Sequence, residues 1–176
     1  MNARNILFAA IVVASFTALG ACTRAADAPP NPPSATVAAA TPGTLDQAAP
    51  LPVMLVHKNA SCGCCNGWIE HMRAAGFSVE ARDVDDLDPV KGRVGVPFGK
   101  GSCHTAEVGG YFVEGHVPAA DIKRLLAEKP DARGLVVPGM PAGSPGMEMP
   151  DGRTQPYVVE LVGRDGTPSE FARHGD

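Results

Sequence analysis

The hydrophobic and polar positions of the chain predict a β-α-β unit that begins at residue 51. Residues 51–57 form a short continuous apolar run, which is typical of a buried strand. Residues 77–84 alternate between apolar and polar side chains, as a half-buried strand does. A helix is predicted between them over residues 66–75, because apolar side chains recur there at helical spacing and Gly76 provides a stop. A connection of this length predicts parallel strands joined by a right-handed crossover.

The rest of the chain continues the mixture of helices and strands. Residues 118–129 are the clearest helix, since Pro118 suits its first turn and its apolar residues lie on one face. Residues 140–149 belong to a long loop rich in Gly, Pro and Met. Shorter elements are predicted as a helix within 85–100, a strand at 111–117, an apolar run at 135–137 and a closing hairpin of 157–163 and 169–173. The fold class is therefore α/β.

The N-terminal segment has the pattern of an export signal. Residues 1–22 combine Arg4 with an apolar stretch that is too short to span a bilayer comfortably. They end in Leu-Gly-Ala-Cys, which resembles a bacterial lipobox and predicts that Cys22 is lipidated. An ordinary signal peptide with an incidental Cys22 is the alternative. The signal predicts a periplasmic, lipid-anchored protein, and Thr23 favours the outer membrane over the inner one.

Composition divides the mature chain into a tether and a folded domain. Residues 23–50 are dominated by Ala, Pro and Thr without apolar periodicity, which predicts a disordered tether ahead of a domain at 51–176. The net charge is −4 and only 5% of the residues are aromatic, so nothing favours nucleic acid as a partner. Five cysteines are an odd number, and assigning Cys22 to lipid leaves four for the domain.

Those four cysteines are Cys62, Cys64, Cys65 and Cys103, and their spacing permits several chemistries. Cys62 and Cys65 have the C-x-x-C spacing of a redox dithiol, and they stand where a strand leads into a helix. The positive end of a helix dipole lowers the pKa of a thiol and makes thiolate available. Structural disulfides are a second possibility in an exported domain, although the neighbours Cys64 and Cys65 are poorly placed to bridge each other.

Metal binding is the other chemistry that the cysteines allow. Zinc accepts four thiolates, but structural zinc sites usually pair two separate C-x-x-C segments, whereas this chain divides its cysteines three and one. Cu(I) prefers soft thiolate and thioether ligands, and crowded thiolates can bridge several Cu(I) ions. His104, Met147 and Met149 are candidate secondary ligands. His57 and His116 are weaker candidates, since a single histidine is more often structural.

Several motifs in order resemble the CopG-type periplasmic copper-resistance proteins, a cysteine-rich family formerly described as a domain of unknown function. The resemblance covers about residues 52–174. It is carried by residues 62–65 with Trp68, 102–105, 114–118, Ile122 with Leu125 and Leu126, 139–141, and 143–148. It implies a thioredoxin-like fold and a multinuclear copper site. Each of the four cysteines matches the family pattern and is therefore expected to bind copper. Three thiols on one loop cannot surround a metal cluster without a fourth from another element, so Cys103 is expected to lie close to Cys62, Cys64 and Cys65.

The predicted function is binding of copper, as Cu(I), in a multinuclear thiolate site that contributes to periplasmic copper resistance and redox handling. The expected partners are copper ions, the membrane through the lipid anchor, and a periplasmic copper efflux system or a metallochaperone. The alternative is a thiol–disulfide oxidoreductase that uses Cys62 and Cys65. A redox dithiol requires neither Cys64 nor Cys103, nor a Met-rich loop, and this surplus of sulfur favours metal.

Overall fold

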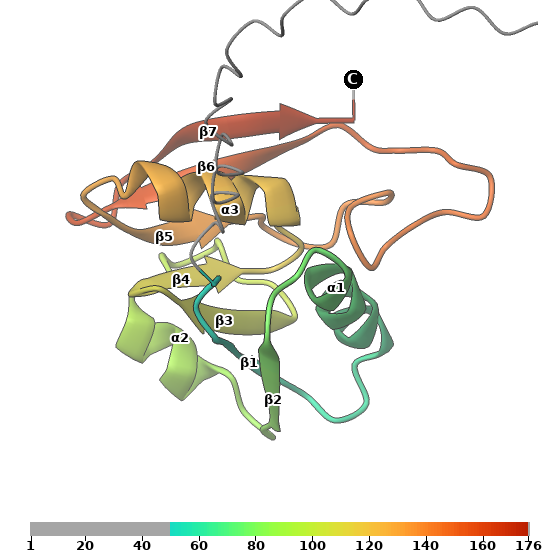
Figure 1. Ribbon diagram of the computed structural model, residues 1–176, viewed down its shortest axis with the longest axis horizontal. Coiled ribbons are helices and arrows are strands. Elements are labelled where there is room, and N and C mark those ends of the chain that lie inside the picture. The colour runs from blue at the N-terminus through green and yellow to red at the C-terminus, as the bar shows by residue number, and fades with distance from the viewer. Residues whose placement is uncertain (1–49, 176) are drawn as a thin grey trace, which may run out of the picture. The chain divides into compact units, whose positions relative to one another are not determined.

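A computed structural model describes residues 50–175 as a seven-stranded mixed sheet with three helices (Figure 1). The strand order is β2-β1-β3-β4-β5-β6-β7. The elements are β1 (Met54–Lys58), α1 (Gly63–Ala74), β2 (Val79–Asp83), α2 (Asp88–Val94), β3 (His104–Val108), β4 (Tyr111–Glu114), α3 (Ala119–Glu128), β5 (Ala132–Val136), β6 (Tyr157–Gly163) and β7 (Pro168–His174).

The predicted β-α-β unit is present at the start of the domain. Strands β1 and β2 pair in parallel, with Met54 opposite Val79, and α1 connects them. Helix α1 begins at Gly63, earlier than the predicted start at residue 66. The first turn was missed because Cys65 was not counted as an apolar residue. In the structure Cys65 is buried together with Trp68, Ile69 and Met72, so it belongs to the apolar face of the helix. Two of the cysteines therefore belong to the helix itself.

Strand β3 was not predicted. It pairs antiparallel with both β1 and β4, and it carries the chain directly away from Cys103. Its residues do alternate, since Ala106 faces the core while Glu107 contacts α2 on the other side. The polar residues at its start and the Gly-rich loop before it obscured that pattern.

Strand β4 is shorter than the predicted strand at 111–117. Gly115 has a φ of +74°, and a Cβ atom there would lie 2.5 Å from the carbonyl oxygen of Val137. The backbone therefore turns at a position that favours glycine. The predicted helix at 118–129 and the closing hairpin of β6 and β7 are present, with slightly different ends.

The two faces of the sheet differ in character. Helices α1 and α3 pack on one face around Trp68, Met72 and Leu125, which are fully buried. Helix α2 covers the opposite face and has no buried residue. Ion pairs of Lys91 and Arg93 with strand residues attach α2 to the sheet, together with a small apolar cluster. The α2 face is therefore the more polar one.

The predicted signal segment 1–22, its Cys22 and nearly all of the tether at 23–50 lie outside the described residues. Within residues 50–175, no helix combines the length and the apolar character needed to cross a bilayer.

Candidate metal centre

Three of the four cysteines are positioned by the first turn of α1. Cys62 is the N-cap residue in an extended conformation, and Cys64 and Cys65 belong to the helix. Cys62 and Cys65 are joined by a disulfide, whereas Cys64 is a free thiol. The first backbone N–H groups of a helix lack intrahelical partners, so this end attracts negative charge.

The fourth cysteine approaches from the loop before β3. The Sγ atom of Cys64 lies 3.5 Å from that of Cys62 and 3.8 Å from that of Cys103. The four Sγ atoms lie within 4.8 Å of one another. The predicted convergence of Cys62, Cys64, Cys65 and Cys103 is thus observed, whereas metal binding by them stays a prediction. Once the Cys62–Cys65 disulfide is reduced, the donor set fits a soft metal ion, because four sulfur ligands lie together.

His116 adds a nitrogen atom to the four sulfur atoms of the cluster. Its Nε2 lies 3.1 Å from the Sγ of Cys103, and its Nδ1 lies 2.8 Å from the carbonyl oxygen of Pro145. A carbonyl oxygen only accepts hydrogen bonds, so Nδ1 carries the hydrogen and donates it. Nε2 then presents a lone pair to the sulfur of Cys103. His116 was a minor candidate in the sequence, and its orientation by Pro145 gives it the geometry of a ligand.

His104 lies behind the sulfurs, against the core. Its Nδ1 is 3.4 Å from the Sγ of Cys103, and its ring centroid is 4.4 Å from that of Trp68. Burial, reinforced by the charges of His116 and Lys91, lowers the pKa of His104 to about 3. Its Nε2 is buried without a hydrogen-bond partner among the described residues. The ring is therefore neutral, and Nδ1 is the nitrogen that lies beside the cluster.

The electrostatic environment of Cys103 differs from that of a typical reactive cysteine. Burial, followed by the negative charge of Cys64, raises the pKa of the Cys103 thiol to about 11. Without metal this thiol is protonated at neutral pH. A metal ion that binds here must displace the proton, so binding releases protons to solvent. The predicted activation of thiols by the helix dipole does not extend to Cys103.

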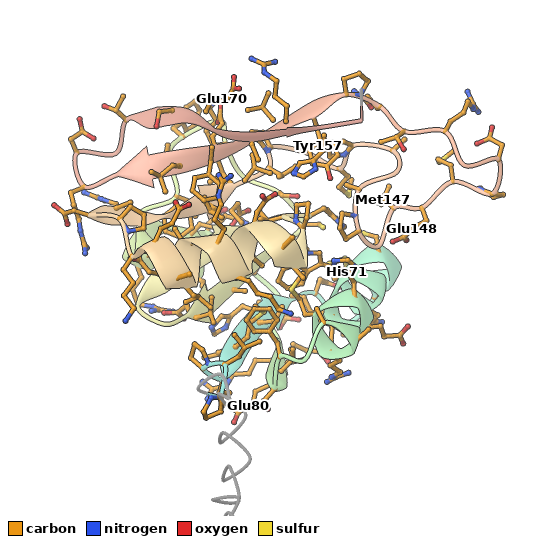
Figure 2. All side chains as sticks on the ribbon, turned by 45° about the horizontal axis from the view of Figure 1, so that its top comes forward. His71, Glu80, Met147, Glu148, Tyr157 and Glu170 are labelled. Carbon is orange, nitrogen blue, oxygen red and sulfur yellow. A yellow bond between two sulfur atoms is a disulfide. The ribbon has the colours of Figure 1, made fainter. Side chains whose placement is uncertain are left out.

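The loop between β5 and β6 brings the thioether of Met140 to the cluster, whereas the candidate ligands from the sequence were Met147 and Met149. The Sδ atom of Met140 lies 3.9 Å from the Sγ of Cys64, and Met140 is 51% exposed. Met147 and Met149 make no such contact among residues 50–175, and Met149 lines a separate small cavity. Figure 2 shows Met147 on the part of this loop that lies beside α1.

Close backbone packing fixes this loop against α1. A Cβ atom at Gly146 would lie 2.5 Å from the amide nitrogen of Trp68 and 2.6 Å from the carbonyl oxygen of Cys64. The neighbouring Pro145 carbonyl is the one that orients His116. His57, the remaining histidine candidate, instead contacts Glu107 at 3.2 Å.

The chain is similar to proteins that are already known. Residues 100–147, which include Cys103, His116 and Met140, match a family model described as "Protein of unknown function, DUF411". Two solved structures match nearly over their whole length. "Copper resistance protein copG- Form 1" is 50% identical with a TM-score of 0.67, and covers 71% of this chain and 99% of its own. "Copper resistance protein copG- Form 2" is 49% identical with a TM-score of 0.67, and the match covers 70% of this chain and 98% of that one. No curated protein matches the chain.

Proposed function

The chain belongs to the family of CopG-type copper resistance proteins, and on this premise we propose that it binds copper through Cys62, Cys64, Cys65 and Cys103. The ions are bound as Cu(I) in a multinuclear thiolate site, and the protein contributes to periplasmic copper resistance and redox handling. The observation that carries the proposal is the convergence of four Sγ atoms within 4.8 Å from two distant segments of the chain.

The chemistry of the cluster supports copper over harder ions. Thiolate, thioether and neutral imidazole are the ligands that Cu(I) prefers, and Met140 and His116 add the last two to the cysteines. Four thiolates gathered around a single ion would still repel one another strongly at this separation. Copper ions shared between sulfurs relieve that repulsion, which favours several ions in one cluster over one ion bound by a single pair.

The disulfide between Cys62 and Cys65 connects this site to redox chemistry. While these two sulfurs are bonded to each other, only Cys64 and Cys103 are free thiols. Reduction by an external dithiol would transfer two electrons and two protons to the disulfide, giving two thiols and an oxidised dithiol. All four sulfurs would then be available to copper. Copper binding would therefore depend on the redox state of the chain.

A thiol–disulfide oxidoreductase is the second candidate function. The same disulfide at the start of α1 favours it, since a helix N-terminus stabilises the thiolate that exchange reactions need. Exchange between Cys62 and Cys65 would not require the thiol of Cys64 or Cys103. The presence of both beside the disulfide supports copper binding as the leading function.

The fold and the cellular context are also part of the proposal. The order β2-β1-β3-β4 with a parallel β1–β2 pair, and a cysteine-bearing helix directly after β1, supports a thioredoxin-like fold. A lipid anchor at Cys22 would hold the protein in the periplasm, at the outer membrane. There it would exchange copper with an efflux system or a metallochaperone.

Metal analysis of the full chain tests the proposed function. The protein would be isolated from the periplasmic fraction of copper-supplemented bacteria, and its copper and zinc contents measured per chain. Several copper ions per chain support the proposal, provided that Cys64→Ser and Cys103→Ser reduce them. Metal-free protein that reduces insulin would favour the oxidoreductase, and inert protein without free thiols would indicate structural disulfides.

A further inference from the structure

A buried ion pair lies close to the metal centre without touching its sulfur atoms. The carboxylate of Glu114 on β4 is fully buried and pairs with the ammonium of Lys91 on α2, whose side chain is 16% exposed. The Nζ of Lys91 also donates to the hydroxyl oxygen of Thr105 at 3.1 Å. The second carboxylate oxygen of Glu114 accepts from that hydroxyl at 2.7 Å. Every charged atom of the pair thus has a partner.

The same two side chains bind the backbone immediately before Cys103. Glu114 accepts a hydrogen bond from the amide N–H of Ser102, and Lys91 donates to the carbonyl oxygen of Ser102 at 3.1 Å. That carbonyl belongs to the peptide bond between Ser102 and Cys103. The peptide groups on both sides of Ser102 are therefore held by one ion pair.

The ion pair acts from the face of the sheet opposite to the sulfurs. Thr105 is paired with Glu114 across β3 and β4, and both side chains point toward α2. His104 precedes Thr105 and points the other way, against Trp68. Lys91 and Glu114 are consequently separated from the cluster by the sheet backbone, and they influence it through the position of that backbone.

Stability alone is a poor explanation for this arrangement. Removing two charges from water is costly, and replacing a buried ion pair with apolar residues of similar volume is often neutral or stabilising. The pair does attach α2, but an apolar contact would also do this. What an apolar pair would not do is bind both the N–H and the C=O of Ser102.

We propose that Lys91 and Glu114 are positioning residues of the metal centre, which hold the Ser102–Cys103 peptide so that the Cys103 thiol stays within reach of Cys64. The proposal rests on the proposed function only in that Cys103 is a copper ligand. The position of the Cys103 thiol is a property of the chain itself, and it can be measured without copper.

Disulfide equilibrium with glutathione measures this positioning. In the full chain carrying Cys62→Ser and Cys65→Ser, the thiols of Cys64 and Cys103 react with one oxidised glutathione to give their disulfide and two reduced glutathione molecules. The equilibrium constant reports how closely the two thiols are held. Adding Lys91→Met with Glu114→Leu removes both charges together, so that neither is left buried and unpaired.

The expected result is a loss of at least about tenfold in this equilibrium constant, with an unfolding midpoint in urea close to that of the parent. The matched control is Lys100→Met with Glu160→Gln. It removes the ion pair between Lys100, in the loop that leads to Cys103, and Glu160 on β6, whose side chains are 30% and 22% exposed. The control should leave the constant within about twofold of the parent.

Equal constants in the parent and the folded Lys91→Met, Glu114→Leu variant would overturn the proposal. If that variant does not fold, the isosteric Glu114→Gln variant decides: a loss of at least threefold supports the proposal and an unchanged constant overturns it. With all cysteines present, Glu114→Gln should also weaken Cu(I) binding. If even the parent binds no copper, the proposed function fails, while the glutathione measurement still decides whether the pair positions Cys103.

Discussion

The Sγ atoms of Cys64 and Cys103 lie 3.8 Å apart although the residues are separated by 39 positions in the chain. Cys64 is fixed by the first turn of α1, and Cys103 by the loop that leads into β3. Neither element alone could surround a metal ion. The contact between them is the relationship on which the copper-binding proposal depends, and it determines which substitutions should matter.

The reactivity of Cys103 should rise with pH over an unusually alkaline range. Because burial, together with the charge of Cys64, raises its pKa to about 11, its alkylation rate should still increase between pH 9 and pH 11. Iodoacetamide labelling of copper-free protein, followed by mass spectrometry of the Cys103 peptide, measures this rate. In Cys64→Ser the pH at which the alkylation rate of Cys103 is half its maximum should be lower, because the charge of Cys64 is removed. A plateau near pH 9 in the unsubstituted chain would contradict the described environment of Cys103.

Acid should destabilise the copper-free protein through His104. Burial lowers its pKa to about 3, whereas the unfolded chain binds this proton near pH 6.5. The contribution to stability is therefore complete above pH 6.5 and is lost as the pH falls toward 3. The free energy of unfolding in urea should fall between pH 7 and pH 4.5 in the parent. In His104→Gln this fall should be smaller by about 2 kcal/mol. The same pH dependence in both proteins would show that His104 is not held neutral.

Packing of the Met-containing loop on α1 should depend on Gly146. Alanine at this position, where φ is +83°, would bring a Cβ atom to 2.5 Å from the amide nitrogen of Trp68. Gly152→Ala is a matched control, because φ is +72° there and no atom lies within 4 Å of the added Cβ. Gly146→Ala should destabilise the fold by about 1–3 kcal/mol more than the control in urea unfolding. An equal loss of stability in Gly146→Ala and Gly152→Ala would mean that the loop does not pack against α1.

The choice of methionine ligand can be tested by a pair of leucine substitutions. Met140 contacts Cys64, whereas Met149 lines a separate cavity. Met140→Leu should therefore weaken Cu(I) binding by about 1 kcal/mol, which is roughly fivefold, and Met149→Leu should leave it unchanged. Competition against a chromophoric Cu(I) chelator measures both. The reverse order would favour the assignment made from sequence.

The sequence predicted the β-α-β unit and the place of the cysteines because both depend on local periodicity. The approach of Cys103 to the other three was also predicted, on the chemical ground that three thiols on one turn cannot surround a metal cluster. Strand β3 was missed, since its alternation is short and begins with polar residues next to a Gly-rich loop.

The sequence could not identify the methionine and histidine ligands. Their positions depend on the path of the loop between β5 and β6, which the spacing of apolar residues does not predict. Met140, Met147 and Met149 all belong to the same Gly- and Pro-rich loop of the sequence, and what distinguishes Met140 in the structure is its Sδ atom 3.9 Å from the Sγ of Cys64. His116 likewise depends on the carbonyl of Pro145, which a distant part of the chain supplies. The lipid anchor at Cys22 and the tether stay predictions.

The most direct test of the central claim is Cu(I) competition on Cys62→Ser, Cys64→Ser and Cys103→Ser, with a disulfide-reduction assay on the same variants. If the four thiols form one copper site, Cys64→Ser and Cys103→Ser should lose nearly as much Cu(I) affinity as Cys62→Ser, because bridging thiolates share the same ions. Full copper binding by Cys64→Ser, together with loss of reductase activity in Cys62→Ser alone, would contradict the account and identify the chain as a dithiol oxidoreductase.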